Sequence, residues 1–81
     1  MHLPMCVKII ELLAENEGLR LPEIASVTCK GDEDTRKILH TLENCGWVQN
    51  YLQNGTSYFK LTKMGSELLN AIGRFYNQYY R

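Results

Sequence analysis

The spacing of apolar residues changes at Gly46, and this change constrains the fold more than any other feature. Before it, Ile38, Leu42 and Cys45 recur at steps of four and three, which is the spacing of one face of an α-helix. After it, aromatic and branched residues dominate two short runs, as in β-strands. Glycine can take the left-handed conformation that ends a helix. The sequence therefore predicts a helix over 33–45 followed directly by strands.

The predicted helix has a polar start and a polar face. Asp32 is the expected N-cap, because its carboxylate can accept hydrogen bonds from the free N–H groups of the first turn. The face opposite the apolar one carries Glu33, Arg36, Lys37 and His40. We therefore expect a helix that packs on a small core and presents this polar face to a partner.

The two runs after the helix read as a β-hairpin over 47–61. Asn54-Gly55 lies between them, and this dipeptide favours a two-residue type I′ turn. Thr62 then caps a last helix over 63–81, in which Gly65 and Gly73 either weaken the helix or allow close packing.

Two shorter helices precede the central one. Apolar residues at steps of three and four over 5–13 predict an amphipathic helix that ends near Gly18. The segment 19–21 is too short for a strand of its own, but it can add an edge to the later sheet. Pro22 opens a second helix, which Gly31 interrupts. Two helices joined by such a short turn form a helix-turn-helix.

Four stretches carry the apolar pattern of a known family: 7–16, 21–25, 35–43 and 46–48. A fifth, 61–65, resembles the start of the last helix in many small winged-helix regulators. With the element order helix, short strand, helix, turn, helix, hairpin, helix, the chain resembles a winged helix-turn-helix domain. More narrowly, it resembles the N-terminal DNA-binding domain of IclR-type transcriptional regulators. The resemblance covers roughly residues 5–70. In such proteins a glycine is common in the turn where this chain has Cys29.

The resemblance implies a single α+β winged-helix domain over 1–81 and a small transcriptional regulator. Helix 33–45 would read the major groove of double-stranded DNA, and the 47–61 wing would touch the backbone. Arg36 there can bond guanine and Lys37 can meet phosphate. The expected DNA-binding residues are Lys30, Glu33, Thr35, Arg36, Lys37, His40, Asn54, Lys60 and Lys63.

The charge distribution leaves an alternative open, a winged-helix module that binds protein and not DNA. The formal net charge is zero. Residues 1–45 hold five basic and eight acidic side chains, and residues 46–81 hold four and one, so the halves carry −3 and +3. Glu33 and Asp34 begin the recognition helix, where such proteins usually have Ser, Thr, Lys or Arg. These carboxylates either accept bonds from cytosine or only complement the helix dipole.

Catalysis, cofactors and metals are not expected. The sequence has no nucleophile–base pair, no carboxylate pair and no phosphate-binding glycine loop. Its three widely spaced cysteines fit unpaired thiols in a reducing cytoplasm, with Cys6 and Cys45 buried or half-buried. The histidines and cysteines lack metal-ligand spacing, and no apolar run suits a signal peptide or a membrane span.

The C-terminal helix suggests a homodimer. At 19 residues, 63–81 would span about 28 Å, longer than a domain this small needs to cover its own core. Aromatic residues that extend past a core usually meet another chain. The alternative is that the tail folds back against the first helix. The expected dimer interface is Ile72, Phe75, Tyr76, Tyr79 and Tyr80.

Overall fold

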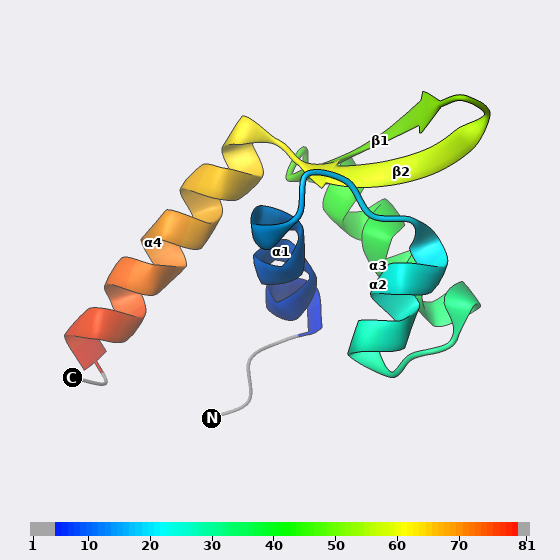
Figure 1. Cartoon of the computed structure of the whole chain (residues 1–81). Coiled ribbons are helices and arrows are strands. Elements are labelled where there is room, and N and C mark those ends of the chain that lie inside the picture. Colours follow the sequence, from blue (N-terminus) through cyan, green and yellow to red (C-terminus); the bar gives the residue numbers. More distant parts are fainter. Residues whose placement is uncertain (1–4, 80–81) are drawn as a thin grey trace.

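The computed structural model describes residues 5–79, without the side chains of Tyr76 and Tyr79. Its elements follow the expected order, so the α+β winged helix-turn-helix fold is confirmed (Figure 1). They are α1 (Met5–Glu15), α2 (Leu21–Thr28), α3 (Asp32–Asn44), β1 (Val48–Gln53), β2 (Thr56–Leu61) and α4 (Lys63–Tyr79).

The core lies where α1, α2 and α3 meet under the start of the hairpin. Each of the three helices turns one apolar stripe inward, and β1 closes the core through Val48. Burying one such aliphatic side chain contributes about 1.5–3 kcal/mol. Because α3 seals one face on this core, its other face is left to solvent. The buried cluster consists of Ile9, Ile10, Leu13, Ile24, Leu39, Leu42 and Val48.

The short segment after α1 joins the hairpin, as expected. The N–H of Leu19 donates to the carbonyl of Phe59 at 3.0 Å, and the N–H of Phe59 donates back at 2.8 Å. Leu19 thus forms an isolated antiparallel bridge with β2. The bridge ties the chain between α1 and α2 to the wing.

The start of α2 is fixed by a local polar contact. The backbone N–H of Arg20 donates to the Glu23 carboxylate at 2.9 Å, and the Arg20 side chain lies 3.2 Å from the same oxygen. The hydrogen bond from the backbone N–H has the largest effect on the carboxylate, and together with the side-chain hydrogen bond it lowers the pKa of Glu23. Pro22 occupies the first turn of the helix, as expected.

The hairpin turn is the predicted one. Asn54 and Gly55 both have positive φ, 53° and 79°, as a type I′ turn requires. Gln53 pairs with Thr56 across this turn. Because side chains alternate along a strand, the hairpin has two faces. We call the face toward α3 the inner face (Val48, Asn50, Leu52, Ser57, Phe59 and Leu61) and the opposite one the outer face (Gln49, Tyr51, Gln53, Thr56, Tyr58 and Lys60).

Both ends of α3 differ from the prediction by one residue. The N-cap is Gly31 and no side-chain cap bond is present, so the prediction that Asp32 is the N-cap was wrong. Asp32 is instead the first helical residue, where its charge complements the helix dipole. At the other end the helix stops at Asn44, and Cys45 is exposed rather than buried. Gly46 has a φ of 82°, as expected for the residue that ends the helix.

The start of α4 is anchored to the junction between α3 and the hairpin. The Thr62 hydroxyl accepts the N–H of Gly65 at 3.1 Å and donates to the carbonyl of Gly46 at 2.6 Å, so the predicted cap is confirmed. A Cβ added to Gly65 would collide with the Trp47 carbonyl oxygen and the Leu61 side chain. Gly65 therefore allows close packing, one of the two alternatives.

The rest of α4 runs away from the three-helix core (Figure 1). Leu68 and Leu69 pack against the core, whereas Phe75 is 51% exposed. Of the expected interface residues, the side chains of Tyr76 and Tyr79 and the whole of Tyr80 lie outside the described residues.

Within residues 5–79, no helix has the length and hydropathy needed to cross a membrane. In the same part of the chain, no three His, Cys, Asp or Glu side chains come close enough to hold a metal ion.

Candidate nucleic-acid interface

The turn between α2 and α3 begins with a left-handed residue. Cys29 ends α2 with a φ of 60°, a left-handed conformation. This is the position where similar domains commonly have glycine, and the backbone explains why. A residue with a side chain pays about 1–2 kcal/mol for this conformation. Its thiol is exposed.

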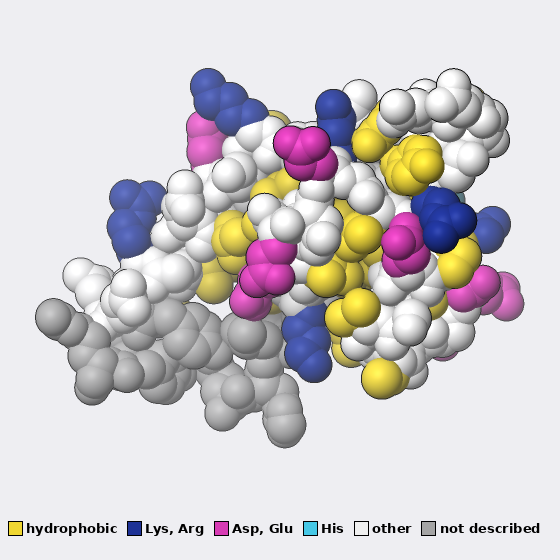
Figure 2. Space-filling model, viewed as in Figure 1, with side chains coloured by type: hydrophobic (Ala, Val, Ile, Leu, Met, Phe, Trp, Pro, Cys, Tyr) yellow, Lys and Arg dark blue, Asp and Glu magenta, His cyan; other side chains and the backbone are white. Residues whose placement is uncertain are grey.

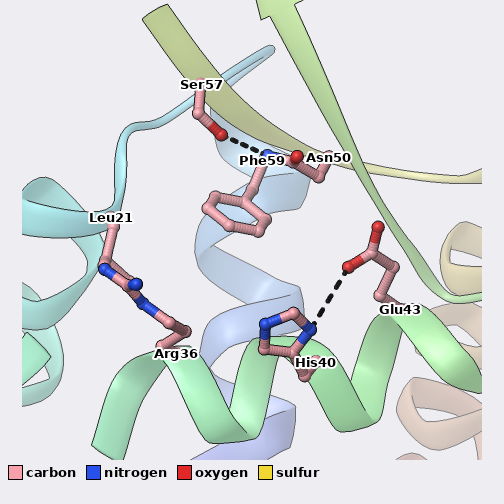
Figure 3. A pocket seen from close by; sticks show the side chains of 7 residues that line it. All are labelled: Leu21, Arg36, His40, Glu43, Asn50, Ser57 and Phe59. Carbon is pink, nitrogen blue, oxygen red and sulfur yellow. Dashed lines mark hydrogen bonds and ion pairs between the residues drawn. The ribbon is translucent and has the colours of Figure 1, made fainter. Parts of the chain in front are cut away.

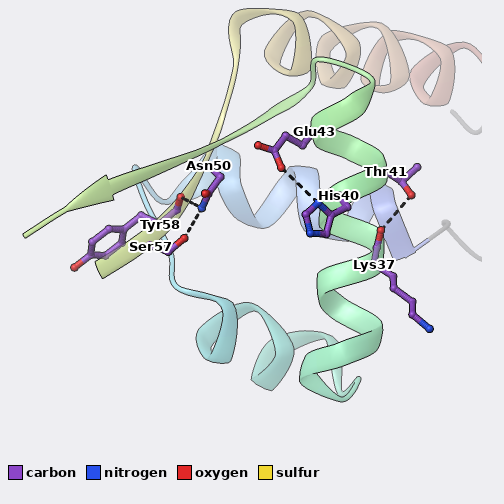
Figure 4. Close-up of polar contacts among 7 residues, drawn as sticks. All are labelled: Lys37, His40, Thr41, Glu43, Asn50, Ser57 and Tyr58. Carbon is purple, nitrogen blue, oxygen red and sulfur yellow. Dashed lines mark hydrogen bonds and ion pairs between the residues drawn. The ribbon is translucent and has the colours of Figure 1, made fainter. Parts of the chain in front are cut away.

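The outward face of α3 carries the side chains that the sequence predicted. Glu33, Arg36, Lys37 and His40 are all exposed. Arg36 and His40 border the space between α3 and the hairpin. Figure 4 shows Lys37 pointing away from the hairpin, on the other side of the helix. The helix therefore presents its cations on two flanks.

Thr35 was wrongly predicted to contact DNA. Its exposed fraction is 0%, because it lies four residues before Leu39 and seven before Leu42, on the face that packs on the core. Its hydroxyl oxygen has no hydrogen-bond partner among the described residues.

We expect Thr35→Val to raise the free energy of unfolding by about 1 kcal/mol, because it removes a buried hydroxyl that makes no bond. Urea denaturation measures the change. The matched control is Thr41→Val on the same helix, whose exposed hydroxyl donates to the Lys37 carbonyl at 3.1 Å. A loss of stability in Thr35→Val larger than in Thr41→Val would contradict this expectation.

A groove of about 290 Å³ separates α3 from the inner face of the hairpin (Figure 3). On the hairpin side, the Asn50 amide of β1 donates to the Tyr58 carbonyl of β2 at 3.0 Å and also to the Ser57 hydroxyl. On the α3 side, His40 Nδ1 lies 3.9 Å from Glu43 Oε1. The lining residues are Leu21, Arg36, His40, Glu43, Asn50, Ser57 and Phe59.

Asn50 and Ser57 are the residues that the sequence did not assign to this surface. Asn50 pairs with Phe59 in the middle of the hairpin. Ser57 received no role. The signal that would have found both is the register fixed by the Asn54-Gly55 turn, which puts them on the face of Phe59.

Lys60 is not brought together with the α3 cations. It belongs to the outer face, where its Nζ lies 5.2 Å from the centre of the Tyr51 ring. Tyr51 in turn stacks on Tyr58, with ring centroids 5.6 Å apart. The outer face is therefore an aromatic surface with one cation above it.

The remaining candidates are spread over the molecule. Lys30 lies in the turn before α3, Asn54 at the hairpin tip and Lys63 at the start of α4, all exposed. Figure 2 shows, for one face, Lys and Arg side chains at separate places among Asp and Glu. On the face drawn in Figure 2, the Lys and Arg side chains thus form no continuous basic stripe.

No family model matches this chain, and no curated protein matches its sequence. Solved structures do match. The S. aureus MepR–DNA complex shares 17% identity over 94% of this chain and 65% of that chain, with a TM-score of 0.87. NadR in complex with 4-hydroxyphenylacetate shares 32% identity over 96% of this chain and 58% of that chain, with a TM-score of 0.82.

A MarR family protein from Bacillus stearothermophilus also matches, with 15% identity over 96% of this chain and 55% of that chain and a TM-score of 0.83. This chain spans less than two thirds of each of these proteins. The likeness confirms the winged helix-turn-helix fold of transcription regulators. It does not support the narrower IclR-type resemblance, since these neighbours are MarR-family regulators.

Proposed function

We propose that this chain is a small transcriptional regulator that binds double-stranded DNA sequence-specifically, with α3 in the major groove and the wing against the backbone. The observation that carries the proposal is the arrangement of α3. Its apolar face is sealed on the core, and Arg36, Lys37 and His40 are exposed beside a projecting hairpin. The MepR structure, which has the same fold, was solved with DNA.

The side chains divide into two groups by what they would contact. Arg36 suits base edges, since a guanidinium can bond guanine O6 and N7 together. Lys30, Lys37 and Lys63 suit phosphates, and Asn54 at the hairpin tip suits the backbone or the minor groove. Glu33 accepts from cytosine N4 or remains a solvated partner of the helix dipole. Lys60, on the outer face, would add only long-range attraction.

Arg36→Ala should weaken binding to a selected duplex by about 1–3 kcal/mol and relax one base position. Lys37→Ala should weaken binding about equally for all sequences and reduce the salt slope by about one. Titrations of labelled duplexes at several salt concentrations measure both effects. The control is Lys8→Ala, which removes an exposed cation from α1. Failure of the intact chain to bind any duplex at low salt would refute the proposal.

The alternative is a winged-helix module that binds protein. The observation in its favour is the first turn of α3, where Asp32, Glu33 and Asp34 are all exposed. Affinity for mixed-sequence duplex that falls steeply with salt would refute this alternative, because the slope counts phosphate contacts. The DNA-bound neighbour makes it the less favoured of the two.

We also infer kinship with MarR-family regulators rather than with the IclR type. The identity to NadR, 32% over 96% of this chain, supports this kinship.

We further infer a homodimer joined through α4. The exposure of Phe75 on a helix that leaves the core supports the dimer. Two copies would double the phosphate contacts and so offset the weak charge of one. A DNA-binding role and unpaired cysteine thiols both suggest a location in the cytoplasm.

A further inference from the structure

The groove between α3 and the inner face of the hairpin occupies a defined place in the proposed complex. With α3 in the major groove of the DNA and the wing at the adjacent minor groove, the DNA strand that separates these two DNA grooves must pass between α3 and the hairpin. The protein surface that faces this strand is the groove itself (Figure 3). The side chains that line the protein groove would therefore face the sugars and phosphates of this DNA strand.

The groove has polar groups on both sides. Arg36 and His40 extend into it from α3, and Asn50 and Ser57 face them from the hairpin (Figure 3). The Ser57 hydroxyl, which accepts a hydrogen bond from the Asn50 amide, and the imidazole can each donate a hydrogen bond to an anionic oxygen. Phe59 forms an apolar floor below them. Arg36, His40 and Ser57 are exposed, and Asn50 is half-buried, so a ligand in the groove can reach them.

The charges around His40 decide how well this groove accepts an anion. Its charged neighbours are Arg36 and Glu43, both on α3. The residues that the hairpin and α2 contribute to the lining are uncharged. With a neutral imidazole, the guanidinium and the carboxylate cancel. With a protonated imidazole, the groove carries one net positive charge.

We propose that this groove is a binding site for one backbone phosphate of the duplex, completed by protonated His40 together with the Ser57 hydroxyl, which the Asn50 amide holds in place. The inference rests on the proposed DNA binding and goes beyond it. Because the phosphate binds the protonated imidazole more strongly than the neutral one, DNA affinity rises as pH falls. The experiment covers the range between about pH 5 and pH 8, in which histidine side chains in general can change their charge.

The test is a titration of the full chain with a labelled duplex at constant ionic strength, from about pH 8 down to about pH 5.5. Wild type should bind about tenfold more tightly at the lower pH, the size of one charge-assisted hydrogen bond. His40→Gln should lose the response, so that its affinity does not rise as the pH is lowered. Glu43→Gln should bind more tightly at the upper pH, by about threefold, because a carboxylate leaves the site.

Lys8→Gln is the matched control, since it removes an exposed charge from α1, away from the groove. It should keep the full pH response. A His40→Gln variant that keeps the response, or a wild type with salt-dependent binding and no response, would overturn the phosphate site and leave the DNA-binding proposal intact. Absence of duplex binding at every pH would refute both the phosphate site and the DNA-binding proposal.

A second measurement identifies the source of the phosphate. The ring resonances of His40 are followed by NMR during addition of duplex and, separately, of inorganic phosphate. A large shift with duplex and a small one with inorganic phosphate supports a site for the DNA backbone. Equal shifts with the two would overturn that assignment, because the site would then take free phosphate.

Discussion

Gly65→Ala is expected to lower the free energy of unfolding by about 2–3 kcal/mol. Gly65 is buried in the first turn of α4, and a Cβ there would meet the Trp47 carbonyl oxygen and the Leu61 side chain. The carbonyl belongs to the backbone, which cannot move aside as the end of a flexible side chain can. Urea denaturation of the variant beside the wild type measures the loss.

Gly73→Ala on the same helix is the control and should change stability in the opposite direction. No atom lies within 4 Å of a Cβ built at Gly73. Alanine is a better helix former than glycine by about 0.5–1 kcal/mol, so the variant should be more stable by up to that amount. If both variants changed stability equally, the close approach of α4 to Trp47 would be contradicted.

The junction around Gly65 matters because three elements meet there. The Trp47 N–H donates to the Leu42 carbonyl of α3 at 3.0 Å, and the Thr62 N–H donates to the Trp47 carbonyl at 3.0 Å. The Thr62 side chain closes the first turn of α4. These bonds fix the direction in which α4 leaves the domain relative to α3. A dimer through α4 would therefore hold its two recognition helices in a fixed relation.

The sequence predicted the parts of this fold that local chemistry decides. The hairpin followed from Asn54-Gly55, and the cap of α4 followed from Thr62. It predicted α3 well but not its ends, because Asp32 and Gly31 both suit an N-cap and only the path of the preceding turn selects between them.

The candidate site was harder to predict because it depends on which sides of the elements meet. A helical pattern alone put Cys45 on the core face and left Thr35 on the outside, whereas α3 ends before Cys45 and turns Thr35 toward the core. The groove with Asn50 and Ser57 needs the hairpin register and its docking on α3 together. The docking of the hairpin on α3 depends on contacts between residues far apart in the sequence, so no single stretch of sequence predicts the groove.

Phe75→Glu is expected to convert a dimer into a monomer and to weaken binding to a two-half-site duplex by about a hundredfold. Phe75 is 51% exposed on a helix that runs away from the core, in a chain 44 Å long but only 25 and 20 Å across. A partner copy would bury such an aromatic residue, and a carboxylate there could not be buried without a cation. The paired recognition helices would suit half-sites about 34 Å apart.

Sedimentation or light scattering at tens of micromolar gives the mass, and a duplex titration gives the affinity. The control is Asn77→Glu, which adds the same charge to an exposed position on the other side of α4 and should leave the dimer intact. A monomer mass for the intact chain would refute the dimer. A Phe75→Glu variant that remains dimeric would move the interface away from α4, and α1, the helix beside it, would then be the surface to test.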